Sequence, residues 1–313
     1  MKYDVIIIGG GIAAFGAAIY CGRFQLKTLV IGEKFGGTIM LTDDVANYPG
    51  FKRISGMELF DKVKDHAQDY DIEVAEKKVV SVKKCKDGCF KIFTNEDAYE
   101  TKTIIFATGT EWKKLDVPGE KEFSGLGVHY CGLCDGPIYK NKTIGVVGGS
   151  DSAAKEALLL AEYGKKVFII YRKEKIRAEP INLRKVEKNK KIEIINNTNI
   201  KEIKGNKTVT SVVLDKPYNG SNELKLDALF IEVGHIPISY LVKDIGVKLN
   251  GKNEVIINDN SATNVEGVFA AGDVTNSKFK QAITGVAEGV IAAYNVYEYI
   301  NKDTPVCGCS EDN

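Results

Sequence analysis

The sequence predicts an α/β protein with two parallel β-sheets, because two separate segments each read as a strand, a glycine-rich turn and a helix. The first strand, residues 5–8, has four β-branched apolar residues, as expected of a strand buried on both faces. The second strand covers residues 143–147. A further apolar strand, residues 267–271, follows the second segment, so we expect the second domain to be inserted into the first.

The first turn carries Gly9, Gly11 and Ala14 in the spacing GxGxxA, followed by a small-residue helix to about Cys21 and a strand at residues 28–31. Such glycines allow a tight turn and the close approach of a pyrophosphate. The helix N-terminus then binds the phosphates through free N–H groups and its dipole. One motif of this kind is weak support for a dinucleotide site, whereas two in one chain are moderately strong.

The second turn, residues 148–153, leads into a helix to about Tyr163 and a strand at residues 166–171. Two Rossmann-like units imply two nucleotides or two halves of one transfer. The chain after the second strand, residues 171–177, is basic where an NAD site usually carries an acid for the ribose 2′-hydroxyl. Cations there fit a 2′-phosphate, with an exposed basic turn as the alternative interpretation.

The segment Cys131-Gly132-Leu133-Cys134-Asp135 lies just ahead of the second unit. Two cysteines at this spacing can close a small disulfide that exchanges readily, and an adjacent acid can manage protons during the exchange. The alternative is half of a structural zinc site, for which Cys307 and Cys309 would have to supply the remaining ligands. Asp135 and the two nucleotide turns favour redox chemistry, so we predict no metal site.

Composition excludes several classes of function. The 313 residues are 44% hydrophobic and 27% charged with a net charge of +1, so we expect no nucleic-acid partner and no membrane partner. The longest apolar run, residues 5–20, is interrupted by glycines and does not predict a membrane span. An odd count of seven cysteines and a start unlike a signal peptide lead us to expect a cytoplasmic protein.

The ordered set of motifs resembles the low-molecular-weight thioredoxin reductases over nearly the whole chain. The segments that carry the resemblance are Gly9-Gly10-Gly11, Gly36-Gly37, residues 45–50, Ala107-Thr108-Gly109, residues 131–136, Tyr171-Arg172-Lys173 with Arg177-Ala178, residues 234–237, and Gly272-Asp273 followed by Gln281-Ala282-Ile283. The ordered set is much more specific than any single segment.

The resemblance implies a flavoprotein disulfide reductase that passes electrons from NADPH through FAD and a dithiol to thioredoxin or a similar small protein. It implies a homodimer, with an FAD domain (residues 1–113 and 240–313) split around an NADPH domain (residues 114–239) that carries the redox disulfide. The FAD ligands that it implies are Gly9, Gly11, Ala14, Glu33, Gly37, Thr38, Asn47, Ala107, Thr108, Gly109, Asp273, Lys280, Gln281 and Ala282. The NADPH ligands are Gly148, Ser150, Asp151, Ser152, Arg172, Lys173 and Arg177.

The same resemblance assigns unequal roles to the two cysteines. Cys134 would receive electrons from reduced FAD, and Cys131 would attack the disulfide of the partner protein. Asp135 would donate a proton to the leaving thiolate and recover it later. His129, two residues before the pair, is expected to pack or to face solvent, although its position would also allow it to tune the dithiol.

Several positions depart from the family pattern. Ser150 replaces the middle glycine of the second turn, and Lys280 stands where arginine is frequent. The strand at residues 28–31 ends without an acid, so Glu33 is expected to substitute as the ribose ligand. Because Ser150 puts the electron donor in question, NADH or reduced ferredoxin could take the place of NADPH. The same fold could also serve as a dithiol oxidase or as a non-catalytic flavin redox sensor.

Four further cysteines are interpreted more simply. Cys85 and Cys89 flank a short turn and would face each other across a three-residue loop but not across a two-residue loop, so the sequence leaves their bonding open. Cys307 and Cys309 are interpreted as an exposed pair near the end of the chain, with an electron relay as the alternative.

Overall fold

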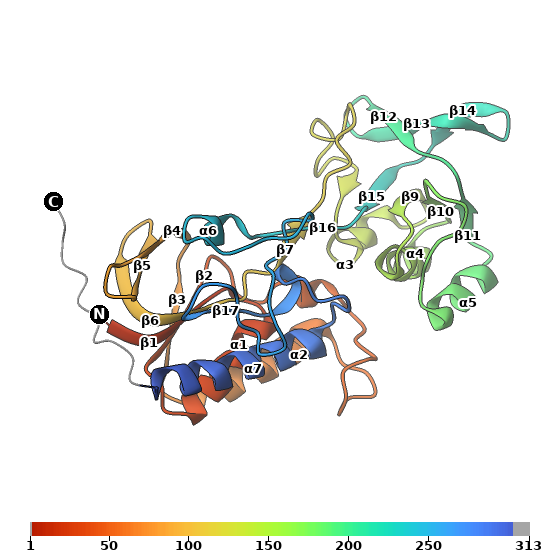
Figure 1. Cartoon of the computed structure of the whole chain (residues 1–313). Coiled ribbons are helices and arrows are strands. Elements are labelled where there is room, and N and C mark those ends of the chain that lie inside the picture. The colour runs from red at the N-terminus through yellow and green to blue at the C-terminus, as the bar shows by residue number, and fades with distance from the viewer. Residues whose placement is uncertain (1, 303–313) are drawn as a thin grey trace. The chain divides into compact units, whose positions relative to one another are not determined.

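A computed structural model describes residues 2–302 and divides the chain into two compact units (Figure 1). Unit 1 comprises Met1–Glu111 and Ile236–Asn313, and unit 2 comprises Trp112–His235. The polypeptide therefore leaves unit 1, forms unit 2 and returns. Within residues 2–302, no helix has the length and apolar character needed to cross a membrane.

Unit 1 is built on a seven-stranded sheet in the order β3-β2-β1-β6-β5-β4, with β17 also paired to β6. Strands β1, β2, β3, β6 and β17 are parallel, whereas β4, β5 and β6 form an antiparallel meander. Their bounds are β1 Lys2–Ile8, β2 Thr28–Gly32, β3 Ile72–Glu76, β4 Val79–Lys84, β5 Phe90–Thr94, β6 Ala98–Phe106 and β17 Val268–Ala270.

Strand β1 is buried on both faces, so its alternate residues enter two different cores. Val5 and Ile7 pack with the helices α1 (Ile12–Arg23), α2 (Gly56–Gln68) and α7 (Ala282–Ile300), which Figure 1 shows on one side of the sheet. Ile6 and Ile8 pack on the opposite face. Residues of β4, β5 and the short α6 (Tyr240–Lys243) complete that second core.

Unit 2 has a five-stranded parallel sheet in the order β11-β10-β9-β15-β8. The bounds are β8 Val128–His129, β9 Thr143–Gly148, β10 Lys166–Ile170, β11 Ile192–Ile195 and β15 Ala228–Glu232. The helices are α3 Gly132–Asp135, α4 Asp151–Tyr163 and α5 Pro180–Lys188, with the 3₁₀ turn η2 at Gly136–Tyr139. A small antiparallel sheet contains β12 Ile200–Gly205, β13 Val209–Tyr218 and β14 Ser221–Lys225.

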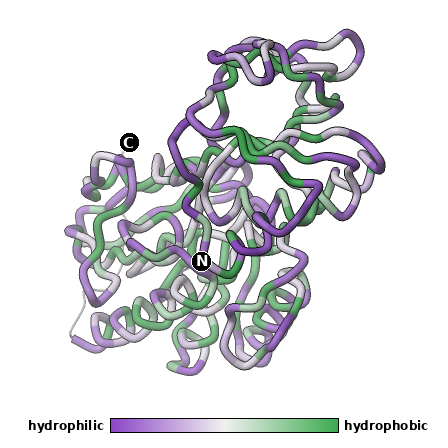
Figure 2. Tube along the Cα trace, turned by 90° about the vertical axis from the view of Figure 1, so that its right-hand side faces the viewer, coloured by the Kyte–Doolittle hydropathy of each residue, from purple (hydrophilic) through white to green (hydrophobic). Residues whose placement is uncertain are grey.

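The two segments that connect the units are β7 (Thr110–Trp112) and β16 (His235–Pro237), and they pair with each other in a two-stranded ladder. In Figure 2, hydrophobic and hydrophilic stretches alternate along the Cα trace, and many of the outer loops are hydrophilic. Two further 3₁₀ turns, η1 (Thr38–Leu41) and η3 (Gly272–Val274), belong to unit 1.

The predicted α/β class with parallel sheets is confirmed. Helix α4 ends at the predicted Tyr163. Strand β2 runs one residue longer than expected, to Gly32, so Glu33 follows it directly. In the β4–β5 hairpin the N–H of Cys85 donates to the carbonyl of Cys89 at 2.8 Å. The two cysteines therefore face each other across a three-residue loop.

Candidate active site

A disulfide joins Cys131 and Cys134, whose Cα atoms are 5.4 Å apart. Strand β8 ends two residues before Cys131, and Cys131 is the N-cap of α3, so the CxxC spacing forms a single helical turn. The N–H of Cys134 donates to Sγ of Cys131 at 3.2 Å. In the reduced protein this donor would favour a thiolate at Cys131, the form in which cysteine attacks disulfides.

The two cysteines differ in accessibility. Cys131 is 8% exposed, whereas Cys134 is an exposed residue. Accessibility therefore gives no separate support to Cys131 as the sulfur that meets a partner. That assignment rests on the resemblance and on the hydrogen bond from Cys134.

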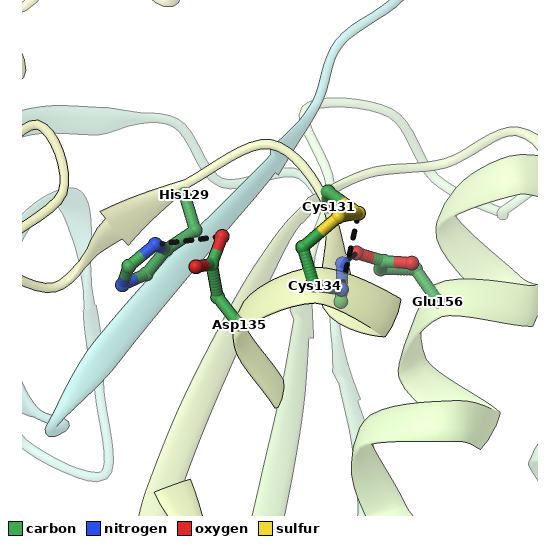
Figure 3. Close-up of a disulfide and its surroundings, with 6 residues drawn as sticks. His129, Cys131, Cys134, Asp135 and Glu156 are labelled. Atoms are coloured by element: carbon green, nitrogen blue, oxygen red, sulfur yellow. Dashed lines mark hydrogen bonds and ion pairs between the residues drawn. A yellow bond between two sulfur atoms is a disulfide. The ribbon is translucent and has the colours of Figure 1, made fainter. Parts of the chain in front are cut away.

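The side chain of Asp135 points toward His129, and its Oδ2 lies 3.1 Å from Nδ1 of the imidazole (Figure 3). Nε2 of His129 is 2.7 Å from the hydroxyl of Tyr139 in η2. Burial lowers the pKa of His129, although Asp135 acts in the opposite direction. Burial also raises the pKa of Tyr139, and Asp135 adds to this effect. His129 is thus buried as packing would require, but it also contacts the predicted acid.

A second carboxyl group contacts the redox turn from α4. Glu156 accepts the N–H of Gly132 and approaches the turn from the side opposite Asp135 (Figure 3). Burial raises the pKa of Glu156 to about 7, with an opposing contribution from this hydrogen bond and a reinforcing one from Asp135. Glu232, the last residue of β15, has a pKa raised to about 8 by burial and by Glu156.

The second glycine turn connects β9 to α4 at the same edge of the sheet as the disulfide, because β8, β9, β10 and β15 are parallel. The ring of Tyr171 occupies the space where Gly149 would carry a side chain. Ser150 is the N-cap of α4 and is exposed, and its hydroxyl makes no capping hydrogen bond. Carboxyl ends of parallel strands are where nucleotides bind in open α/β sheets.

Residues 172–177 lie beside this turn. The N–H of Arg177 donates to the carbonyl of Gly149 at 2.6 Å, and Arg172, Lys173 and Arg177 are exposed. Ser152 is exposed in the first turn of α4. These are the residues that the sequence predicts for the nucleotide 2′-phosphate and pyrophosphate.

Asp151, predicted as a nucleotide ligand, is already engaged within unit 2. Its Oδ1 accepts the N–H of Glu179 at 2.8 Å and the amide of Asn182 at 2.9 Å, and its Oδ2 pairs with Lys155 at 3.0 Å. Partial burial opposes these contacts, but together they lower the pKa of Asp151. The visible role of this carboxylate is to hold the start of α4 against the segment before α5.

The first glycine turn in unit 1 has the shape of an anion cradle. Gly9 has φ +139° and touches the carbonyl of Ala107, where a Cβ would lie 2.1 Å from the oxygen. In contrast, a Cβ on Gly11 would meet no atom within 4 Å. Gly11 caps α1 without a side-chain hydrogen bond, and the first turn contains no acid. The open space and the unpaired helix terminus fit a bound pyrophosphate.

The other predicted flavin residues gather at the carboxyl ends of β2, β6 and β17 or beside α7. Asn47 donates to Oε1 of Gln281, the N-cap of α7, at 3.0 Å. Thr108 donates to the carbonyl of Ile238 at 2.7 Å. Lys280 pairs with Glu254 at 2.6 Å and donates to the carbonyl of Asp273 at 2.9 Å. The remaining ones are Ala14 in α1, Glu33 after β2, Gly37 and Thr38 at η1, Ala107 and Gly109 after β6, and Ala282 in α7.

Glu33 has a partner of its own, because its carboxylate lies 3.1 Å from the ammonium group of Lys78. Among residues 2–302, no group of three or more His, Cys, Asp and Glu side chains is placed to hold a metal ion. Cys307 and Cys309, considered as zinc ligands or as a relay, lie outside the described residues.

Sequence reasoning missed Glu156 and Glu232 entirely. Glu156 follows Lys155 in an amphipathic helix and resembles a solvated charge. Glu232 is the last residue of an otherwise apolar strand, and an acid at the carboxyl end of a parallel strand is the signal that would have drawn attention to it.

The family profile described as pyridine nucleotide-disulphide oxidoreductase matches residues 3–289. Thioredoxin reductase of Treponema pallidum is 39% identical over 302 residues, which cover 96% of this chain and 97% of that protein. Thioredoxin reductase of Bacillus subtilis is 39% identical over 305 residues, with 96% and 95% covered. The crystal structure of Lactococcus lactis thioredoxin reductase superposes with a TM-score of 0.92 at 38% identity, covering 96% of this chain and all of that chain.

The ferredoxin-flavin thioredoxin reductase of Clostridium acetobutylicum is 32% identical, covers 96% of this chain and 99% of its own, and has a TM-score of 0.52. The motifs, the disulfide and these similarities agree. The chain therefore belongs to the pyridine nucleotide-disulphide oxidoreductases and, among them, to the low-molecular-weight thioredoxin reductases.

Proposed function

We propose that this protein reduces the disulfide of thioredoxin or a similar small dithiol protein, with NADPH as electron donor and FAD as prosthetic group. The observation that carries the proposal is the Cys131–Cys134 disulfide at the same sheet edge as a glycine turn. Overall, NADPH, a proton and the partner disulfide would give NADP⁺ and the partner dithiol.

The chemistry of the cysteines follows from their surroundings. Cys131 thiolate attacks the partner disulfide, forms a mixed disulfide and releases one partner sulfur, which takes a proton from Asp135. Asp135 then recovers a proton from the Cys134 thiol, and the Cys134 thiolate attacks Sγ of Cys131, closes the Cys131–Cys134 disulfide and releases the second partner sulfur, which takes a proton from solvent. The donor bond from the N–H of Cys134 to Cys131 supports Cys131 as the first nucleophile.

The residues of unit 1 fit FAD, because the turn at Gly9 and Gly11 leaves open space at an uncapped helix terminus. Bound FAD would supply two-electron transfer between the nicotinamide and the disulfide. Gly11 and the first N–H groups of α1 would hold the pyrophosphate. Asn47, fixed by Gln281, would present polar groups to the rest of the cofactor.

The choice of NADPH rests on unit 2. Helix α4 begins without a side-chain cap, and Arg172, Lys173 and Arg177 are exposed beside it. An uncapped helix N-terminus with nearby cations favours a phosphorylated ligand. Reduced ferredoxin is the second candidate donor, because a ferredoxin-flavin thioredoxin reductase is among the structural relatives.

The proposal is tested with Cys134→Ser. We expect this variant to keep its flavin and to oxidise NADPH with artificial acceptors, but to lose thioredoxin reduction. Cys21→Ala is the matched control, since Cys21 is buried in the core of unit 1 and burial raises the pKa of its thiol to about 12. Full thioredoxin turnover by Cys134→Ser would refute the assignment.

A second experiment decides between the donors. The purified protein is mixed anaerobically with NADPH, NADH or reduced ferredoxin, and flavin absorbance is followed. Rapid bleaching by NADPH alone supports the proposal, and bleaching by ferredoxin alone supports the ferredoxin-dependent function. In a separate aerobic assay, oxygen consumption with a small dithiol as the reductant would indicate a dithiol oxidase. No turnover with any of these donors would indicate a redox sensor.

We further propose a homodimer in the cytoplasm, the compartment in which thioredoxin keeps thiols reduced. Helices α1 and α7 carry exposed Tyr20, Ile291 and Tyr294, with Tyr294 50% exposed. Apolar side chains of this size on adjoining helices suit a subunit interface. Tyr294→Asp should shift the mass measured by light scattering from dimer to monomer.

A further inference from the structure

The predicted acid of the redox turn contacts a buried imidazole. His129 is 5% exposed, and its ring is stacked on Phe230 of β15, with centroids 5.2 Å apart and an angle of 28° between planes. β8 and β15 pair in parallel, with His129 opposite Phe230. The strand pairing therefore fixes the backbone of His129, and the stacking contact with Phe230 restrains its ring beside Asp135.

The contacts of the two imidazole nitrogen atoms indicate which of them carries the hydrogen. Nδ1 faces a carboxylate oxygen of Asp135 at 3.1 Å, so this nitrogen carries the hydrogen. Nε2 lies 2.7 Å from the Tyr139 hydroxyl, which donates to it if the ring is neutral. Burial lowers the pKa of His129, in agreement with a neutral ring. The chain of donors thus runs from Tyr139 through His129 to Asp135.

We propose that His129 is a positioning residue for Asp135, holding Oδ2 through Nδ1–H so that Oδ1 is left to exchange the proton with the sulfurs. The proposal rests on the reductase function proposed above and deepens it. During thiol–disulfide exchange Oδ1 gives its proton to the departing sulfur and later recovers one from a thiol. The bond from Nδ1–H to Oδ2 is retained throughout, and His129 itself gains and loses no proton.

The charged groups that act on the Tyr139–His129–Asp135 contacts are carboxyl groups, one of which, Asp227, is paired with Lys142 at 3.2 Å. Glu156 of α4 acts on Asp135, and Asp227, which precedes β15, acts on Tyr139. Phe230, on the remaining side of the ring, carries no charge. Because the Glu156 carboxyl group disfavours a second negative charge at Asp135, a donor that holds the Asp135 side chain stabilises its ionised form.

The first test observes the imidazole directly. The full-length, flavin-containing protein is labelled with ¹⁵N-histidine, and its three histidines are resolved by NMR, with His129 assigned by its absence in His129→Gln. We expect the Nδ1–H tautomer at pH 7 in the wild type and a tautomer mixture in Tyr139→Phe. An Nε2–H tautomer or a cationic ring at pH 7 would overturn the proposal. This readout does not depend on thioredoxin, so it is separate from the proposed function.

The second test compares His129→Leu with His129→Gln, because glutamine retains an N–H donor and an acceptor whereas leucine retains only bulk. His129→Leu should lose about ten- to a hundredfold in kcat for disulfide reduction and displace its pH profile, while ferricyanide reduction is unchanged. His129→Gln should recover most of the loss. Equal rates and equal pH profiles for the two variants would overturn the proposal. The flavin content of His129→Leu shows whether this variant is folded. Tyr139→Phe provides a second variant, in which His129 itself is retained. If the wild type itself does not reduce thioredoxin, the proposed function fails and the NMR result alone decides on His129.

Discussion

The N–H of Gly132 donates to the carboxyl group of Glu156, which fixes the N-terminal side of the redox turn to α4. Asp135 and His129 fix its other side to β8. Two acids, Glu156 and Asp135, therefore hold the turn on its two sides, and their environments differ. Partial burial raises the pKa of Glu156 to about 7 and that of Glu232, at the end of β15, to about 8.

These raised pKa values predict that stability depends on pH. Between the ordinary pKa of 4.5 and about 7, the folded protein holds a proton on Glu156 that the unfolded chain releases. The folded state then binds more protons, so the free energy of unfolding falls as pH rises through this window. Glu156→Gln keeps an acceptor for Gly132 and should be more stable than wild type at pH 8.5 by roughly 1–3 kcal/mol, but not at pH 5.

Urea unfolding at pH 5, 6.5 and 8.5 measures this difference. Glu232→Gln provides the partner variant, because Glu156 raises the pKa of Glu232 and the two effects should be less than additive. A Glu156→Gln variant that is less stable than wild type at pH 8.5 would mean that the folded protein needs the ionised carboxylate.

Two glycines of the first turn should separate folding from flavin binding. Gly9→Ala would place a Cβ 2.1 Å from the carbonyl oxygen of Ala107 at a backbone φ of +139°, so it should destabilise unit 1 itself. Gly11 has φ −90° and open space, so Gly11→Ala should fold but fill the pyrophosphate site. Flavin-to-protein absorbance ratios and thermal unfolding of the flavin-free proteins distinguish the two. Full flavin content in Gly11→Ala would argue against the proposed cradle.

The helix pair α1 and α7 offers a matched test of packing. Gly289→Ala would bring a Cβ to 2.5 Å from the carbonyl oxygen of Ala13, and the helices should separate at a cost of about 1–3 kcal/mol. Gly285→Ala meets its nearest atom at 3.4 Å, so it should be neutral or gain up to about 1 kcal/mol from helix propensity. Denaturation midpoints of both variants measure this, and equal values would contradict the close contact at Gly289.

Features formed by residues that are neighbours in the sequence were predicted, whereas features that depend on distant residues were not. The glycine turn at Gly9 and Gly11 was predicted because a strand, a turn and a helix are adjacent in the chain. The contact between His129 and Asp135 was not predicted although the two residues are close in the sequence, since the ring also stacks on Phe230, about a hundred residues later. Asp151 resembled a nucleotide ligand until the fold brought Asn182 to it. Local turn chemistry can be recognised from sequence, whereas partners brought by the sheet cannot.

The basic segment after β10 yields a prediction about the choice of nucleotide. Arg172 is exposed beside the turn that begins α4, and a guanidinium suits the 2′-phosphate that distinguishes NADPH from NADH. Arg172→Ala should therefore raise KM for NADPH by about tenfold or more and leave KM for NADH nearly unchanged. Lys185→Ala, in the last turn of α5, is the control for a general loss of positive charge.

Ser150→Gly completes this test, because the serine hydroxyl makes no capping bond and its side chain stands where a nucleotide would approach. If Ser150 crowds the pyrophosphate, the glycine variant should lower KM for NADPH and NADH alike, whereas Arg172→Ala acts on NADPH alone. Steady-state kinetics with both nucleotides and a common artificial acceptor separates the two effects. If Arg172→Ala raises KM for NADH by the same factor as KM for NADPH, this arginine supports the turn and does not recognise the 2′-phosphate.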